Sequence, residues 1–340
     1  TNGLIIGVSC IEWLKNRKLT LCDMILTSRT MLPVIIISLI ILGIESFTGI
    51  IANGLIIIVN CTEWIRSRKL TCCDMILTSL GISRFFLQWT MFIYSIVLVF
   101  SPVMNEACAI WRNLYIFCMY LNIFSLWFAT WLSVFYCMKI VNFSQPLFLW
   151  LKRRISGLVP QLLMSSLLVS LVTSLLSVSI TDSKYIGNSM NNLSGNTRVE
   201  CSHNVNSSSG LILCMLGYSF PFFIFVVSTV LLITSLWRHT KRMEKNTNIS
   251  RDTITEAHVS VIKGLIAFFF FYISYFVATV LFFSKIFAHS SLYFLWFCVL
   301  VAAAYPSGHS VILILGNPKL KRVAVRALNY AKCWLRDEAS

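Results

Sequence analysis

The chain has 340 residues, of which 57% are hydrophobic and only 12% charged, and its mean hydropathy is +0.78. That leaves too little polar surface to cover a soluble globule, so the composition indicates an integral membrane protein. In such a protein the formal net charge of +15 matters through its distribution among loops, and no nucleic-acid partner is expected. The 12 cysteines contain no CxxC pair and no His/Cys cluster at metal spacing, so no disulfide framework, metal site or cofactor is indicated.

The first 30 residues resemble a later part of the same chain. The stretch NGLIIGVSCIEWLKNRKLTLCDMILTS, from Asn2, matches the stretch from Asn53 at 20 of 27 positions. Its apolar runs are shorter than the roughly 20 residues that cross a bilayer, and basic residues interrupt any signal-peptide core. We interpret residues 1–30 as a partial duplicate of residues 52–81, a non-native extension of a protein that begins at Met31.

Seven later stretches are long and apolar enough to cross a bilayer. They are Leu32–Val59, Asp74–Phe100, Leu114–Met138, Gly157–Ile180, Gly210–Trp237, Val261–Phe287 and Leu292–Leu315. The expected fold is therefore an all-α membrane protein, a seven-helix bundle over residues 31–316.

Basic residues indicate the orientation of this bundle. Nineteen Lys and Arg residues lie after spans one, three, five and seven, whereas the opposite loops hold only four, Arg112, Lys184, Arg198 and Lys285. The positive-inside rule places the tail in the cytoplasm and the region near Met31 outside. Two sequons, at Asn192 and Asn206, fall in a loop predicted to be outside, so both are candidate glycosylation sites.

The tail, residues 317–340, has apolar residues on one helical face and basic residues on the other. This pattern predicts an amphipathic helix along the inner leaflet, with membrane lipid as its partner.

Ionisable and amide side chains inside spans are costly and hence candidates for function. Glu45 and Asn53 share one face of span one, and Arg84 lies half way along span two. A structural network, in which carbonyls or Asn53 satisfy Arg84, is favoured over a direct signalling role. Asn122 lies near the outer end of span three, and Tyr275, with Tyr272, is a candidate cavity residue in span six.

Several motifs are absent. Span three ends in VFYCMKI rather than a DRY triplet, span six has no CWxP, and span seven has no central Lys for retinal. There is no nucleotide-binding loop, HExxH or GxSxG elbow, so no enzyme is expected. The halves lack a matching pair of Gly/Pro-broken helices, so a small-solute transporter is a weak alternative.

From Met31 to about Arg326 the chain resembles the type 2 bitter taste receptors, a family of G-protein-coupled receptors. The resemblance is carried by ESFTGIIANGLII, EWIRSRKLTCCDMILTSLGISR, LWFATWLSVFYCMKIVNFSQPLFLWLKRRI, SLWRHTKRM, EAHVSVIKGLIAFFFFY and AYPSGHSVILILGNPKLKR. A pheromone receptor of the vomeronasal type 1 group is the alternative within the same class, and FYCMKIVNFSQPLFL argues against it.

The resemblance implies a plasma-membrane receptor that detects small bitter compounds and activates a gustducin-type heterotrimeric G protein. The implied ligand-binding residues are Asn122, Cys118, Tyr275, Val299 and Ala302. Cys118 stands where many members have a Trp, and Val299 supplies no charge where some relatives have Glu. The pocket is therefore expected to be mainly apolar, with the amide and a tyrosine hydroxyl as orienting groups. The sequence does not identify the agonist.

The resemblance also implies a set of residues for switching and G-protein contact. They are Tyr136, Lys139, His239, Lys241, His309 and Ser310. Cys108 and Cys201 are both predicted to be extracellular, so a disulfide between them is topologically allowed, but the family generally lacks that bridge and it is not favoured.

Overall fold

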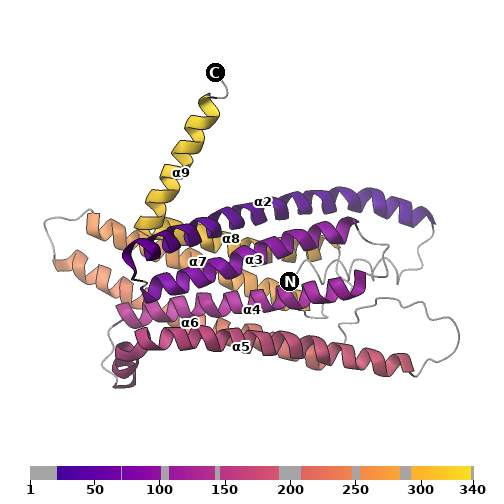
Figure 1. Ribbon diagram of the computed structural model, residues 1–340, viewed down its shortest axis with the longest axis horizontal. Coiled ribbons are helices and arrows are strands. Elements are labelled where there is room, and N and C mark those ends of the chain that lie inside the picture. The colour runs from indigo at the N-terminus through magenta and orange to yellow at the C-terminus, as the bar shows by residue number, and fades with distance from the viewer. Residues whose placement is uncertain are drawn as a thin grey trace.

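The computed structural model describes residues 21–69, 71–100, 107–141, 146–190, 208–246, 253–283 and 292–337, and every described element is an α-helix. Figure 1 shows long, roughly parallel helices and a final helix that projects away from them at a steep angle. The elements are α2 (Leu21–Ser67), α3 (Cys72–Phe100), α4 (Ala107–Ile140), α5 (Pro146–Met190), α6 (Ser208–Asn246), α7 (Thr253–Phe283), α8 (Leu292–Gly316) and α9 (Pro318–Asp337).

Among the described residues, seven helices, α2 to α8, are long and apolar enough to cross a membrane, which confirms the predicted number of spans. Their ends differ from the apolar stretches: α2 has 47 residues and extends beyond Leu32–Val59 in both directions. The flanking residues are ordinary helix formers, and leaving the apolar layer does not interrupt i to i−4 hydrogen bonding. At one end α2 closes at Ser67, where Arg68 takes a left-handed φ of 53° and its N–H bonds the Trp64 carbonyl.

The bundle closes by bringing its first and last spans together. α2 packs against both α3 and α8, and α8 in turn packs against α7. α4 is the central helix, because 72% of its most apolar segment is buried inside the bundle, against 22% for α2. Side chains on α4 therefore contact several neighbours, and polar groups on this helix can join it to more than one of them.

Hydroxyl groups join α4 to α6. Ser133 Oγ lies 2.9 Å from Ser228 Oγ and 2.8 Å from Thr229 Oγ1, and Thr130 donates to the Pro221 carbonyl at 3.0 Å. Lipid tails are as apolar as the helix surfaces, so burial of apolar surface does not drive helices together in a bilayer. Close packing and hydrogen bonds of this kind hold the helices in register instead.

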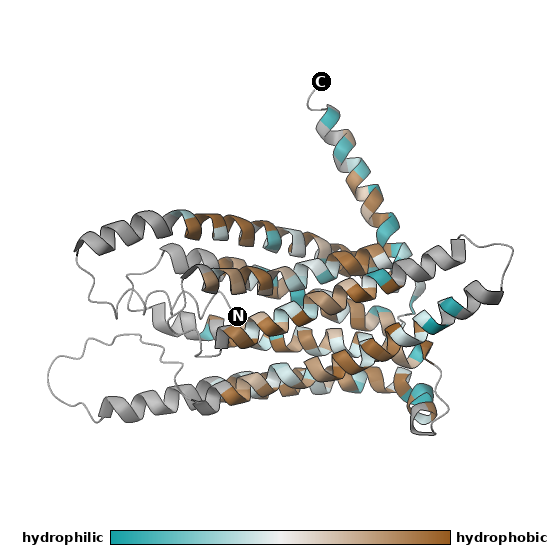
Figure 2. Ribbon diagram, turned by 180° about the vertical axis from the view of Figure 1, so that it is seen from behind, coloured by the Kyte–Doolittle hydropathy of each residue, from teal (hydrophilic) through white to brown (hydrophobic). Residues whose placement is uncertain are grey.

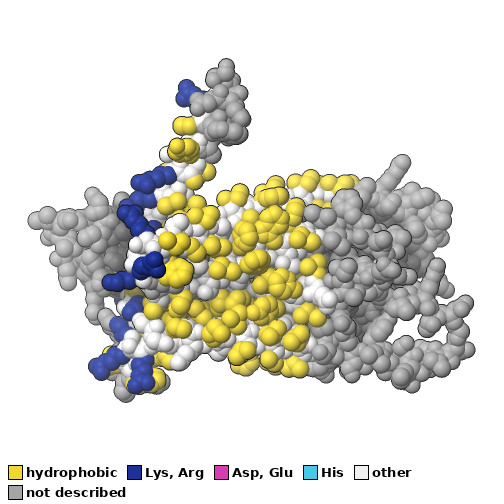
Figure 3. Space-filling view, viewed as in Figure 1, with side chains coloured by type: hydrophobic (Ala, Val, Ile, Leu, Met, Phe, Trp, Pro, Cys, Tyr) yellow, Lys and Arg dark blue, Asp and Glu magenta, His cyan; other side chains and the backbone are white. Residues whose placement is uncertain are grey.

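The outward faces and one end of the bundle have distinct chemistry. Hydrophobic residues make up most of the middle of the helices (Figure 2), and their side chains cover the middle of the bundle (Figure 3). Ile44, Ile51 and Phe223 are 63%, 69% and 62% exposed. Lys and Arg gather at one end, which we call the basic end (Figure 3). Its exposed members include Arg66, Arg153, Arg238, Lys241 and Arg326.

α9 begins at the basic end and projects away from the bundle at a steep angle to its axis (Figure 1). Asn317 Oδ1 accepts from the backbone N–H of Lys319 at 3.0 Å, which caps the first turn. Leu320 is fully buried against the bundle, whereas Leu328 is 63% exposed. Lys319 Nζ lies 2.7 Å from a carboxylate oxygen of Glu63, so an ion pair joins α9 to α2.

Candidate functional site

Asn122 links three helices through one amide group. Its Nδ2 donates to the Tyr275 hydroxyl on α7 at 2.8 Å and to the Tyr218 hydroxyl on α6 at 3.2 Å. All three side chains are buried, with 6% or less exposed. We call Asn122, Tyr218 and Tyr275 the amide triad. It occurs where α4, α6 and α7 meet, so a molecule that hydrogen-bonds there would contact the central helix and two others at once.

Tyr218 was not predicted from the sequence. Its hydroxyl also donates to the Met119 sulfur at 3.4 Å, and it is fully buried. Tyr218 is the only tyrosine in α6, and the need to satisfy a phenol in an apolar span could have marked it.

The other implied pocket residues divide between two places. Cys118, one turn from Asn122 on α4, is fully buried. Ala302 belongs to the same large buried cluster as Tyr275. Val299 lies instead in a separate cluster with Leu42 and Trp296, where α8 packs against α2. The structure therefore does not bring Val299 to the amide triad.

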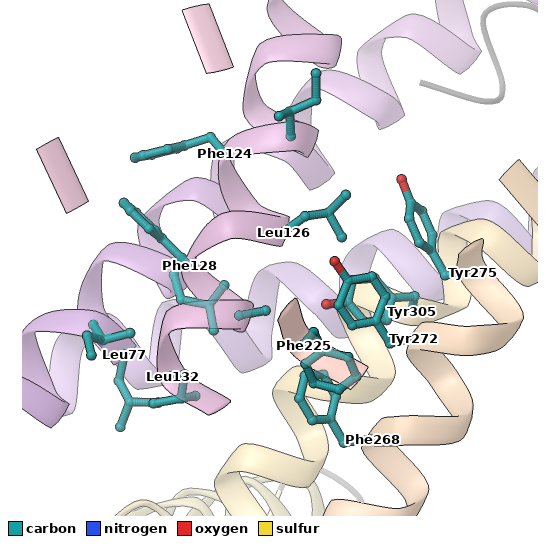
Figure 4. Close-up of a cluster of buried hydrophobic side chains, with 14 of the residues drawn as sticks. Leu77, Phe124, Leu126, Phe128, Leu132, Phe225, Phe268, Tyr272, Tyr275 and Tyr305 are labelled. Atoms are coloured by element: carbon teal, nitrogen blue, oxygen red, sulfur yellow. The ribbon is translucent and has the colours of Figure 1, made fainter. Parts of the chain in front are cut away.

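A group of tyrosine rings lies next to the triad. Tyr305 on α8 packs against Tyr275 with ring centroids 5.0 Å apart and against Tyr272 at 5.1 Å. Figure 4 shows these three rings together, with Phe225 and Phe268 beside them. The rings fill the space between α6, α7 and α8, so movement of any one of these helices must move the others' side chains.

Arg84 forms a second polar group that reaches the same rings. Its Nη2 donates to the Tyr305 hydroxyl at 3.0 Å, and its Nε to Ser125 Oγ on α4 at 3.1 Å. A longer contact of 3.5 Å joins Nη1 to Ser310 Oγ. The guanidinium is fully buried, and its partners among the described residues are neutral hydroxyls rather than a carboxylate. Such a cation is stable only while its donors stay paired.

Asn53 meets Arg84 through an intermediate residue. Ser310 donates to Asn53 Oδ1 at 2.8 Å, while Asn53 Nδ2 donates to the Gly49 carbonyl at 2.7 Å. Arg84 and Asn53 thus belong to one hydrogen-bonded group, with Ser310 between them. Ser310 was expected to serve in switching and G-protein contact on the inner side, and its hydroxyl lies in this buried hydrogen-bonded group.

Glu45 lies farther along α2, away from that group. Its backbone carbonyl accepts from Ser307 Oγ at 2.7 Å, and Gln88 Nε2 donates to the same hydroxyl at 2.8 Å. α2 and α3 approach each other closely at Gly49, where an added Cβ would lie 2.5 Å from Gln88 Nε2. Glu45 and Asn53 share a helix face, but Glu45 contacts Ser307 on α8 through its main-chain carbonyl.

The residues expected to serve in switching and G-protein contact lie in different surroundings. Tyr136 is half-buried, with its hydroxyl 3.3 Å from the Cys73 sulfur on α3. Lys139 is exposed, with Nζ 5.7 Å from the Phe135 ring centroid, and Lys241 is also exposed. His309 is 1% exposed and stacks on Phe268, with ring centroids 3.5 Å apart.

Some predicted residues lie outside the described part of the chain. They are the side chains of His239 and Cys108, together with Cys201, the sequons at Asn192 and Asn206, and residues 1–20.

Comparison with known proteins gives concordant matches. A family model described as taste receptor protein (TAS2R) matches residues 30–332. Human taste receptor type 2 member 2 is 41% identical over 295 residues, which cover 86% of this chain and 96% of the relative. Member 10 of Papio hamadryas is 39% identical over 292 residues, covering 85% and 92%, and member 40 of Gallus gallus is 35% identical over 308 residues, covering 87% and 95%.

The fold also has a solved counterpart. The crystal structure of squid rhodopsin aligns with a TM-score of 0.57 and 14% identity, over 88% of this chain and 86% of that one. At this identity the likeness concerns the fold alone, a bundle of seven helices.

Proposed function

The chain belongs to the taste receptor (TAS2R) family, and on that basis we propose that its amide triad binds small bitter compounds while its basic end activates a gustducin-type G protein. It is a bitter taste receptor of the G-protein-coupled class and not an enzyme. The vomeronasal and transporter alternatives are not favoured, because the family model and the curated relatives are taste receptors.

The single observation that carries the ligand site is the sharing of Asn122 between Tyr218 and Tyr275. The amide and the two phenols offer both donors and acceptors, whereas their surroundings are apolar and aromatic. Such a site suits small amphipathic molecules, with the polar groups fixing orientation and the rings supplying contact area. Cys118 and Ala302 would line the apolar part.

Binding at the triad has a direct mechanical consequence. A ligand that takes over the hydrogen bonds of Asn122 changes what holds α6 and α7 to the central helix α4. The receptor then favours an arrangement in which the basic end of α7 moves outward, because a ligand shifts the population towards the state that it binds better.

The basic end is the proposed surface for the G protein. Lys139 and Lys241 are exposed there, and Tyr136 is held to α3 by the contact with Cys73. His239 belongs to the same proposed surface by its position in α6. His309 and Ser310, being buried, would act as parts of the internal network instead.

The chain is a multi-pass membrane protein, and we place it in the plasma membrane with the basic end in the cytoplasm. The basic residues support this orientation. α9 would then lie along the inner leaflet, with anionic lipid headgroups opposite Lys321 and Arg326. The sequons at Asn192 and Asn206 would face the extracellular side.

Calcium imaging tests the function. Cells would express residues 31–340 or the full chain with a chimeric gustducin-like G protein and receive a panel of bitter compounds. We expect at least one compound to raise calcium in a receptor-dependent and G-protein-dependent way. Silence across a broad panel, with good surface expression, would contradict the proposal, and ligand-independent solute flux in proteoliposomes would favour a transporter.

A further inference from the structure

Tyr305 is a side chain that contacts both Arg84 and the amide triad. It lies in α8, is 1% exposed, and accepts a hydrogen bond from Arg84 Nη2 at 3.0 Å. Its ring also lies under the guanidinium, with Cζ of Arg84 5.0 Å from the ring centroid, which is within the range of a cation–π contact. Tyr305 thus fixes the position of the guanidinium in two ways.

The Tyr305 ring also packs against a member of the amide triad. Its ring centroid is 5.0 Å from that of Tyr275, whose hydroxyl accepts from Asn122 at 2.8 Å. Only one ring therefore separates Arg84 from the triad. Because this packing is dense, a shift of the Tyr275 ring cannot occur without a response from Tyr305.

Arg84, in turn, determines how four helices are joined. It lies on α3 and bonds Ser125 on α4 and Tyr305 on α8, while Ser310 connects it to Asn53 on α2. These partners are neutral, so no carboxylate among the described residues holds the cation in place by charge. Its position depends on neutral hydroxyls and on the Tyr305 ring, and a displaced tyrosine hydroxyl would leave a buried charged donor unpaired.

We propose that Tyr305 is a positioning residue that couples the amide triad to Arg84, so that ligand-driven movement of Tyr275 rearranges the contacts among α2, α3, α4 and α8. This inference rests on the proposed function, because it takes the triad as the place where ligand acts. It assigns Tyr305 an effect on signal transmission and not on ligand contact.

The test separates transmission from binding. Tyr305→Phe keeps the ring and removes the hydroxyl that accepts from Arg84. We expect the maximal agonist response per receptor to fall at least threefold while the half-maximal concentration changes less than threefold. Asn122→Ala should do the reverse, shifting the half-maximal concentration with little change in maximum. The agonist is the first compound that the calcium screen returns.

A matched control makes the same chemical change elsewhere. Tyr120 on α4 is half-buried, and its ring stacks on Phe124 with ring centroids 5.7 Å apart. Tyr120→Phe should leave both parameters within 1.5-fold, on the order of assay error. If Tyr305→Phe behaves like this control, the proposal is overturned.

A second measurement remains informative if little of the variant reaches the cell surface, and it needs no agonist. Isolated membranes containing epitope-quantified receptor would be mixed with purified G-protein heterotrimer, and basal binding of labelled GTPγS would be counted. We expect Tyr305→Phe to change the basal rate per receptor at least twofold from wild type, and an unchanged rate with an unchanged maximal response would refute coupling. A wild-type receptor that responds to no compound and drives no exchange would instead refute the proposed function.

Discussion

Replacement of Asn122 by Ala removes the donor shared by Tyr218 and Tyr275, at 3.2 and 2.8 Å. Hydrogen bonds between membrane helices contribute about 0.6 kcal/mol each, with a maximum near 1.7 kcal/mol. Losing two should therefore destabilise the receptor by about 1–3 kcal/mol. If the amide also orients the ligand, one further bond worth about 0.5–1.5 kcal/mol is lost, which raises the half-maximal agonist concentration between roughly twofold and tenfold.

Ser133→Ala is the matched control for this change. Ser133 lies three turns along the same helix, is 4% exposed, and joins α4 to α6 through Ser228 and Thr229 at 2.9 and 2.8 Å. Its loss should cost a similar amount of stability without touching the ligand site. Potency should then remain at the wild-type value in this variant.

Two assays read the two effects. Unfolding of solubilised receptor can be followed with a thiol-reactive dye, because Cys118, Cys137, Cys214 and Cys298 are buried in the folded chain. Agonist potency comes from calcium imaging corrected for surface density. Equal potency shifts in Asn122→Ala and Ser133→Ala, or no shift in either, would refute the assignment of the triad as the ligand site.

Three further predictions concern packing, the buried cation and glycosylation. Gly49→Ala should lower the free energy of unfolding by about 1–3 kcal/mol, because the new methyl group would meet Gln88 Nε2 at 2.5 Å. Gly43→Ala should be tolerated, because nothing lies within 4 Å of the added carbon. Equal thermal unfolding of the two variants would contradict the close approach at Gly49. Arg84→Ala should reduce at least threefold the fraction of an epitope-tagged receptor that reaches the cell surface. Three contacts to hydroxyls on α4 and α8 are lost, and each well-formed bond contributes about 1 kcal/mol. A normal fraction at the surface would argue against the network. Replacing both Asn192 and Asn206 by Gln should abolish the mobility shift that a glycosidase produces on gels, and persistence of that shift would place glycans elsewhere.

The spans were predictable because their physical requirement is local. About 20 apolar residues must follow one another to cross the hydrocarbon layer, and α2 to α8 meet that requirement in the sequence itself. Helix ends were less predictable. α2 continues to Ser67 because hydropathy reports where the bilayer ends, whereas the helix ends where its hydrogen bonding stops.

The facing of side chains could not be obtained in the same way. Asn122 and Tyr275 were selected as polar groups in apolar spans, and the structure brings them together at 2.8 Å. Tyr305 was missed, because a tyrosine that follows a run of apolar residues, VLVAAA, has no periodic signal that tells lipid from core. The density of polar residues that follow it, in the PSGHS stretch, was the available hint.

The Arg84 group shows a third limit. Asn53 was a predicted partner from burial cost alone, yet the connection passes through Ser310, more than 200 residues away along the chain. Which hydroxyl reaches a buried guanidinium depends on the relative rotation of α3 and α8, and that rotation is set by tertiary packing. Val299 illustrates the same dependence, since it packs with Leu42 rather than near the triad.

Agonist-stimulated nucleotide exchange is the most direct test of the account. Membranes containing this chain would be combined with a purified gustducin-type heterotrimer and labelled GTPγS, with and without a bitter compound that activates cells. The account predicts exchange that rises with the compound in wild-type membranes and shifts to higher concentrations in Asn122→Ala. Exchange that does not respond to any compound, at a receptor density confirmed in the same membranes, would contradict it.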